Sequence, residues 1–540
     1  MSRIAFLIRE SNVWAQQIFH QFQRLVPDRD CACLDTSDLV ARTAACPETA
    51  CVYIPALAGR DSMMPDWAEA ARVLEHVAAL IPKKLVLLSS ALVYGISPGR
   101  QSLVAEDHVP RSYGKREISG SWKSLEALAH RHLDGSVPLT ILRPVTVMLS
   151  PALLSRRLRS KLTVTMPGHN PTLQLLSLQD LAGALLCALD SDKTGVFNVA
   201  PDGVVPLNLA VRIGRGRRLP IGRTLQRLAW RTETLDFLRY PWTVCGAKIQ
   251  RELGFLPHHS SVGAIREAKS LTAPAGTVEP VFDPFGMDRR FVEAFSRTIV
   301  NFLSERYWRV ETKGLEDVPR QGPMVLAGTH RGFMPWDAVV ALRLLLNATG
   351  RLPRFLVHPG LLKFPFVAGF IAKMGGVVAC QESADRVLQN GEMLGMYPEG
   401  VQGAFARLRN AYKVLNFGRN DFVKLALRHR APIQPFVNVG SAEALPIFAQ
   451  VKSRLWIRYS EWPCLPISTF PFLPLPLPSK WHIQFLPTLH VERQYPPEAA
   501  HDPGVVGEIS RTVRRQMQEA LDDMVSKRPS IFYGNIFEPA

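Results

Sequence analysis

The first half of the chain alternates short apolar runs with segments of helical spacing. Apolar runs typical of buried strands occupy residues 3–8, 31–34, 51–57, 84–88, 138–142 and 195–199. Helical spacing covers residues 13–25, through Ile18, Phe19 and Phe22, and residues 67–80. This strand–helix–strand rhythm predicts an α/β fold with a parallel, doubly wound sheet.

The second half begins with a candidate amphipathic helix. Asp288 can cap a helix that runs to about Arg306 and gathers its apolar residues on one side. Such a stripe packs against a core or lies in a membrane interface, and the sequence favours neither. A short apolar strand, Met324–Ala327, and an apolar helix over residues 338–346 follow.

The chain contains two Pro-rich segments. Residues 272–286 hold three Pro and two Gly, which interrupt helix and strand patterns alike. We therefore expect a domain over residues 1–270, a linker over 271–286 and a second domain over 287–540. Residues 465–478 are apolar and so rich in Pro that they form neither a helix nor a central strand. A packed extended segment and an apolar loop that dips into a bilayer both fit that composition.

The charge balance narrows the class of partner. The 540 residues include 64 Lys and Arg against 47 Asp and Glu, a formal net charge of +17, which favours anionic partners. Seven Arg and no acidic residue fall within residues 211–231, which fits an anionic membrane surface or a solvated face. We expect no nucleic acid partner.

Cysteine spacing and hydropathy predict a cytoplasmic protein without a metal centre. The eight Cys have no zinc-site spacing, so we expect no metal site. The sequence shows no secretory signal and no charge-free apolar window of about 18 residues. We expect a location on the cytoplasmic face of a membrane, bound peripherally.

The clearest candidate chemistry lies in residues 329–337, T-H-R-G-F-M-P-W-D. His330 follows a strand and Asp337 begins a helix, while Gly332 and Pro335 let the intervening loop turn back. A carboxylate that fixes the imidazole tautomer and a His that takes a hydroxyl proton form a base and its orienting partner. A loop His beside an Asp also occurs as a plain structural contact.

The first half resembles the extended short-chain dehydrogenase/reductase family, which includes NAD-dependent epimerases and dehydratases. The resemblance rests on L-V-L-L-S-S-A-L-V-Y-G (85–95), L-T-I-L-R-P (139–144), Q-L-L-S-L-Q-D-L (174–181) and G-V-F-N-V-A (195–200). It implies a Rossmann-like fold and places Ser90 and Lys123 at the family's Ser and Lys positions. Ser119 stands where the family has its Tyr, and no Gly lies between the first strand and the first helix, where the sequence reads I-R-E-S-N-V-W-A. We therefore expect a degenerate domain that neither binds NAD(P) nor catalyses oxidoreductase or epimerase chemistry.

The second half resembles the lysophospholipid/glycerolipid acyltransferase superfamily, in particular its monoacylglycerol- and diacylglycerol-acyltransferase-like branch. The resemblance rests on the order of the His–Asp motif, M-Y-P-E-G (396–400) and A-P-I-Q-P (431–435). It implies an α/β acyltransferase fold and O-acyl transfer from acyl-CoA or acyl carrier protein to a hydroxyl of a glycerolipid-like acceptor. His330 is then the general base, Asp337 supports it, and no cofactor is required. The substrate-binding positions that this resemblance implies are Tyr397, Pro398, Glu399, Gly400, Gln402 and Arg407.

Departures from the superfamily pattern keep the acceptor open. Six residues separate His330 from Asp337, where four are commonest, and Val401 and Gln402 replace the Thr and Arg that often follow Gly400. The loss of an Arg that would bind a phosphate group favours a neutral acceptor over a lysophospholipid. Arg407 or Arg409 can take over the role of that lost Arg. Two other functions remain: a bifunctional protein whose first domain is a working NAD(P)-dependent epimerase or reductase, and a non-catalytic membrane scaffold.

Overall fold

The chain divides into two compact units, Met1–Gly286 and Met287–Ala540, in the computed structural model. The structure describes residues 3–37, 49–58, 63–96, 103–108, 117–133, 135–226, 235–270, 282–418, 420–469 and 476–537. Most of the predicted linker, residues 271–281, lies outside the described residues, as do residues 470–475 of the second Pro-rich segment.

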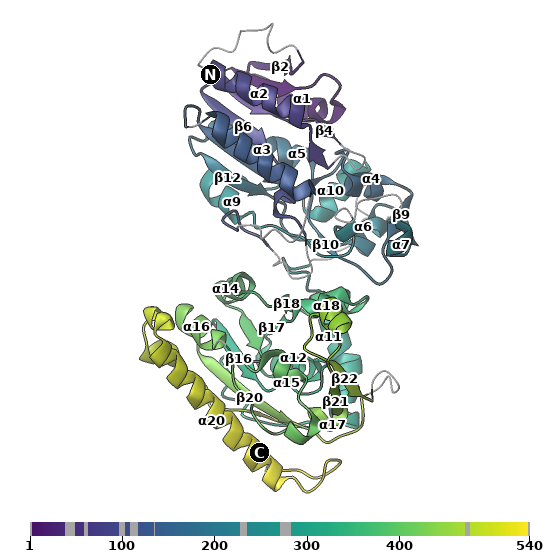
Figure 1. Ribbon diagram of the computed structural model, residues 1–540, viewed down its shortest axis with the longest axis vertical. Helices are drawn as coiled ribbons and strands as arrows, with labels where there is room; N and C mark the ends of the chain where they lie inside the picture. Colours follow the sequence, from purple (N-terminus) through teal and green to yellow (C-terminus); the bar gives the residue numbers. More distant parts are fainter. Residues whose placement is uncertain are drawn as a thin grey trace. The chain divides into compact units, whose positions relative to one another are not determined.

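A six-stranded parallel sheet forms the centre of the first unit (Figure 1). Its strands are β1 (Ile4–Ile8), β2 (Cys31–Asp35), β3 (Ala50–Tyr53), β6 (Lys84–Leu88), β7 (Leu139–Pro144) and β12 (Gly195–Val199). They lie in the order β12-β7-β6-β3-β1-β2, and every pairing is parallel. The predicted doubly wound Rossmann-like architecture is confirmed by this order.

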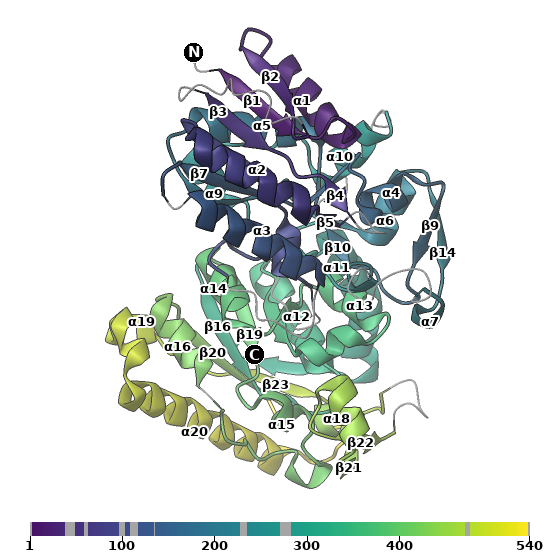
Figure 2. The same ribbon diagram turned by 45° about the horizontal axis from the view of Figure 1, so that its top comes forward.

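Helices cover this sheet because their apolar stripes face it. Helix α1 (Val13–Leu25) packs with α5 (Leu178–Asp190), and α2 (Trp67–Leu80) packs with α3 (Glu117–Leu133) (Figure 2). Asn12 caps α1 and Asp66 caps α2 through their side-chain oxygens, which explains where both helices begin. The other elements near the sheet are β4 (Leu57–Ala58), β5 (Met64–Pro65), η2 (Ala91–Tyr94) and α9 (Ala247–Leu253).

Short strands and helices form a second core in the first unit. They enclose buried apolar side chains that include Leu158, Leu175 and Val205. These elements are β8 (Thr146–Val147), α4 (Leu153–Arg159), β9 (Leu162–Thr165), β10 (Thr172–Leu173), β11 (Leu175–Leu176), β13 (Val205–Pro206), α6 (Leu207–Ile213), β14 (Arg217–Pro220), α7 (Arg223–Gln226) and α10 (Ser261–Ala268).

The second unit is built on a seven-stranded mixed sheet in the order β15-β23-β20-β16-β19-β17-β18. Every pairing is parallel except that of β20 with β23. The strands are β15 (Glu311–Lys313), β16 (Met324–Gly328), β17 (Arg354–Val357), β18 (Val377–Val378), β19 (Met393–Met396), β20 (Ile433–Val439) and β23 (His482–Phe485). At the end of β16 a Cβ on Gly328 would lie 2.3 Å from the ring of Phe436, so only glycine fits beside β20.

Helices and a separate hairpin surround this sheet. The longest of the described helices, α20 (Pro503–Lys527), begins at the N-cap Asp502 and packs on β20 and on the helix over Asp421–Arg428. The other elements are α12 (Trp336–Thr349), η5 (Pro359–Lys363), α13 (Val367–Lys373), α14 (Gln381–Gln389), α15 (Gly400–Ala404), η6 (Leu408–Asn410), α16 (Asp421–Arg428), α17 (Ser441–Ala444), β21 (Ile447–Val451), α18 (Arg454–Ser460), β22 (Leu465–Ser468), α19 (Val491–Gln494) and η7 (Pro497–His501). Among the described helices, none combines the length and the apolar character needed to cross a membrane.

The helix predicted from Asp288 to Arg306 is not regular. Asp288 caps it as expected, but α11 (Arg289–Phe295) gives way to π-helical turns over Ser296–Val300 and Leu303–Tyr307. Each π turn shifts the register, so the apolar stripe does not stay on one side. Phe291 and Phe295 pack on Phe370 of α13, whereas Ile299 and Phe302 are exposed.

Candidate active site

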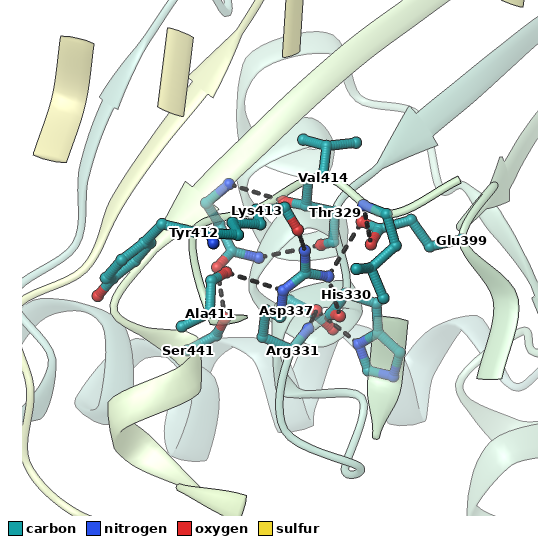
Figure 3. A network of polar contacts seen from close by, with 12 residues as sticks. Thr329, His330, Arg331, Asp337, Glu399, Ala411, Tyr412, Lys413, Val414 and Ser441 are labelled. Atoms are coloured by element: carbon teal, nitrogen blue, oxygen red, sulfur yellow. Dashed lines mark hydrogen bonds and ion pairs between the residues drawn. The ribbon is translucent and has the colours of Figure 1, made fainter. Parts of the chain in front are cut away.

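His330 and Asp337 meet at the C-terminal end of β16. The imidazole Nδ1 lies 2.6 Å from Asp337 Oδ2 (Figure 3). The six-residue gap does not separate them, because the loop turns through Gly332 at a φ of +70° and α12 begins at Trp336. Asp337 therefore lies in the first turn of α12, where the helix dipole stabilises a negative charge.

Four protein donors hold the buried Asp337 carboxylate. Oδ2 accepts a hydrogen bond from the backbone N–H of Arg331 at 3.4 Å and also contacts His330 Nδ1. Oδ1 accepts the N–H of Ala338 at 2.8 Å and the hydroxyl of Tyr397 at 3.2 Å. With both oxygens engaged, the carboxylate is fixed in one orientation and fixes the His330 ring in turn.

Tyr397, from the predicted M-Y-P-E-G motif, forms the second wall of the site. Its ring stacks on His330 with centroids 4.7 Å apart, and on Phe355 at 5.7 Å. Burial, and then the charge of Asp337, raise the pKa of the Tyr397 phenol well above its usual range. The phenol therefore stays protonated and donates to Asp337.

A buried ion pair joins the two motifs. Arg331 Nη1 lies 3.0 Å from Glu399 Oε1, and the two side chains are 2% and 0% exposed. The guanidinium also donates to the backbone oxygens of His330, Ala411 and Lys413, and Glu399 Oε2 accepts the N–H of Leu415 (Figure 3). The carboxylate of Glu399 thus points into the protein and fastens the loop over residues 411–415 to the His330 loop.

A cavity of about 250 Å³ opens beside His330. Its lining is apolar and aromatic, with Phe333, Leu342, Phe355, Ile371 and Trp462 among its walls. The titratable side chains among the lining residues are His330, Tyr397 and His358, so the lining has no Lys, Arg, Asp or Glu. Burial lowers the pKa of His358, which favours its neutral form. The cavity suits an extended apolar group.

The remaining predicted substrate positions surround the start of α15. Gly400 is exposed at a φ of +57° and its N–H donates to the Tyr397 oxygen; Pro398 is half-buried between Tyr397 and Glu399. Gln402 is exposed and Arg407 is half-buried before η6. Among these positions, Tyr397 and Gly400 line the cavity.

Arg331 is the residue that sequence reasoning missed. A charged side chain in a loop is expected to be solvated. The Arg331 guanidinium is instead buried and makes four polar contacts. Its only sequence signal is its position next to His330, and that position does not identify Glu399 as its partner.

Two polar side chains at the crevice of the first unit are engaged by neighbouring residues of the protein. In this sheet the ligand crevice lies at the ends of β1 and β3, where the strand order reverses. Asn12 Oδ1 already accepts the N–H of Ala15 at the start of α1. Asp35, at the end of β2, accepts hydrogen bonds from the Glu10 N–H at 3.1 Å and from the Ser37 hydroxyl at 2.9 Å.

The predicted dehydrogenase-like positions lie on α3 and at the N-cap of η2. Ser119 is buried on α3, and Lys123 is half-buried one turn later. Ser90 caps η2, accepting the N–H of Leu92, and lines a cavity of about 60 Å³ together with Trp14 and Trp122. The phenol that the family's acid/base chemistry needs has no counterpart at residue 119.

Comparisons with known proteins match parts of the chain. The Acyltransferase family model matches residues 309–439. An uncharacterized protein of Mycobacterium tuberculosis is 33% identical over 261 residues, which are 47% of this chain and 72% of that protein. Phytyl ester synthase 2, chloroplastic, of Arabidopsis thaliana is 29% identical over 142 residues, 25% of this chain and 20% of that protein. Among solved structures, the UDP-glucuronic acid 4-epimerase from Bacillus cereus, in complex with UDP-glucuronic acid and NAD, covers 49% of this chain and 98% of its own at 13% identity and a TM-score of 0.38.

Proposed function

Because the chain belongs to the family of its mycobacterial relative and carries an acyltransferase domain, we propose that it transfers a fatty acyl group from a thioester to a lipid hydroxyl. The thioester C–S bond breaks and an ester C–O bond forms. The hydroxyl proton passes to His330 and then to the departing thiolate. No cofactor is required, since the thioester is already activated.

The single observation that carries this proposal is the His330–Asp337 contact beside an apolar cavity that His330 lines. An Nδ1–H that donates to Asp337 leaves the lone pair on Nε2 for the acceptor hydroxyl. The buried carboxylate then stabilises the imidazolium that forms when the proton is taken. Stacking on Tyr397 restricts the ring to this orientation.

The cavity is the proposed site of the acyl chain. A fatty chain gains about 0.8 kcal/mol for each buried methylene, and the lining offers no charge that would oppose it. Placed there, the chain brings its thioester carbonyl to the imidazole. Acyl-CoA and acyl carrier protein are both compatible donors.

A neutral long-chain alcohol or acylglycerol is the proposed acceptor. Arg331, the cation next to His330, is engaged by Glu399 and three backbone oxygens, so it is not available to a phosphate. The name of the plant relative describes synthesis of an ester of phytol, a long-chain alcohol, which supports the same class.

The test is an acceptor panel with purified full-length protein and a labelled long-chain acyl thioester. The acceptors are a monoacylglycerol, a diacylglycerol, phytol and lysophosphatidic acid, with ester products identified by mass spectrometry. We expect ester formation with one or more of the three neutral acceptors. Lysophosphatidic acid as the preferred acceptor would contradict a neutral substrate, and release of free fatty acid alone would contradict acyl transfer.

A further inference from the structure

The segment from β21 to β22 exposes an unusual amount of apolar surface. The connection between these antiparallel strands contains α18, so residues 447–468 form one module, here called the hairpin module (Figure 2). Six large apolar side chains in it are exposed, between 38% and 82%: Phe448, Val451, Leu455, Ile457, Tyr459 and Ile467. Large exposed apolar patches on a protein surface mark interaction sites.

The inner side of the hairpin module is firmly attached to the second unit. Gln450 Nε2 donates to the Phe405 oxygen at 2.6 Å, and Glu461 pairs with Lys363 at 2.6 Å. Trp456 packs against Phe364 and against Trp462, a residue of the cavity wall. The exposed apolar side chains therefore do not result from a loose loop, and the module is the outer side of the wall of the apolar cavity.

Basic residues accompany the apolar ones. Lys452, Arg454 and Arg458 are exposed, and Glu461 is the one acidic residue of the module. No ion pair is present for these three cations within the described part of the chain. Exposed apolar side chains among unpaired cations match the apolar edge and the anionic headgroups of a bilayer.

We propose that the hairpin module docks the protein on an anionic membrane surface. If the proposed acyl transfer is correct, docking here places the bilayer against the cavity wall, so that a lipid substrate need not cross water. The basic stretch 211–231 is a rival surface: Arg215, Arg217 and Arg218 are exposed there, on and beside β14.

Three triple variants of the full chain separate these surfaces. The charge variant changes the cations of the hairpin module: Lys452→Gln, Arg454→Gln and Arg458→Gln. The apolar variant changes its apolar contacts: Val451→Ser, Leu455→Ser and Ile467→Ser. The matched control removes three cations from the rival surface: Arg215→Gln, Arg217→Gln and Arg218→Gln. All nine side chains are exposed, so each variant should unfold at the wild-type temperature.

Flotation with phosphatidylcholine vesicles, with and without an equal share of phosphatidylglycerol, measures docking. We expect the charge variant to bind the anionic vesicles on the order of 100-fold more weakly at low salt, and the control to bind as the wild type does. High salt should weaken wild-type binding to the anionic vesicles but not abolish it. The apolar variant should lose this salt-resistant part of the binding.

Wild-type binding by both module variants, or release by the control alone, would overturn the proposal. A stable wild-type dimer in light scattering that the apolar variant loses would also overturn it, because a second copy would then cover the module. Acyl transfer to a detergent-dispersed acceptor should be equal in all variants. If no variant, the wild type included, transfers acyl groups but the flotation pattern holds, the proposed function fails and the docking surface stands.

Discussion

The buried Arg331–Glu399 pair allows a sharp test of what the M-Y-P-E-G motif does. The resemblance to known acyltransferases implies that Glu399 binds the acceptor, whereas its carboxylate accepts from Arg331 and from the Leu415 N–H and is fully buried. Glu399→Gln keeps the shape and an acceptor oxygen but removes the charge. It leaves the Arg331 guanidinium buried without an opposite charge beside it.

The expected cost follows from burial. Removing one partner of a buried ion pair costs about 3–5 kcal/mol, and the three backbone oxygens around Arg331 place this variant at the lower end, about 3 kcal/mol. In a unit of this size that loss lowers the thermal midpoint by roughly 10 °C. Arg331→Met should cost as much, and the double variant less than the sum, because neither charge is then left alone.

Calorimetry and steady-state kinetics together give the readout. We expect a lower kcat at unchanged acceptor KM, because Arg331 also fixes the backbone oxygen of His330. Asp523→Asn, which breaks the exposed pair with Lys527, is the matched control and should change stability by less than about 1 kcal/mol. A Glu399→Gln protein of wild-type stability with a raised acceptor KM would refute this reasoning and support direct acceptor binding.

Three further predictions concern the base, the first unit and pH. Asp337→Asn should lower turnover sharply, because it removes the charge that supports the imidazolium. Tyr397→Phe should lower turnover only a few-fold, because it removes one of four donors to Asp337. The rates of both variants in the ester assay check these two predictions. Calorimetric titration with NADH and NADPH should show no binding by the first unit, and micromolar affinity would revive the bifunctional alternative. Burial lowers the pKa of His358 and His482, so the folded state binds fewer protons than the unfolded state. The stability of the second unit should therefore fall as the pH drops below about 6.5, less steeply in His482→Gln, as measured by urea unfolding at several pH values.

Elements with a strong local pattern could be predicted from the sequence. The strand over residues 3–8 and the helix over 13–25 are observed as Ile4–Ile8 and Val13–Leu25, because an apolar run and a regular apolar spacing each match one backbone geometry. The helix from Asp288 was predicted as regular, but its π turn over Ser296–Val300 packs against α12, a contact that no local pattern contains.

The site was predictable only as far as its chemistry is local. His330 and Asp337 lie seven positions apart, and the turn between them could be inferred from Gly332. Arg331 and Glu399 are 68 positions apart, and their pairing depends on β16 and β19 being neighbours in the sheet. The apolar residues of the hairpin module could not be identified as exposed, because apolar character alone predicts burial.

The rate of ester formation by His330→Gln tests the central claim most directly. The assay uses the preferred acceptor of the wild type, and His429→Gln is the matched control, since His429 also pairs with an Asp, Asp385, at 2.7 Å but does not line the cavity. The account predicts a loss of about 10²–10⁴-fold for His330→Gln at an unchanged unfolding temperature, and a wild-type rate for His429→Gln. A folded His330→Gln protein that forms ester at the wild-type rate would contradict the account.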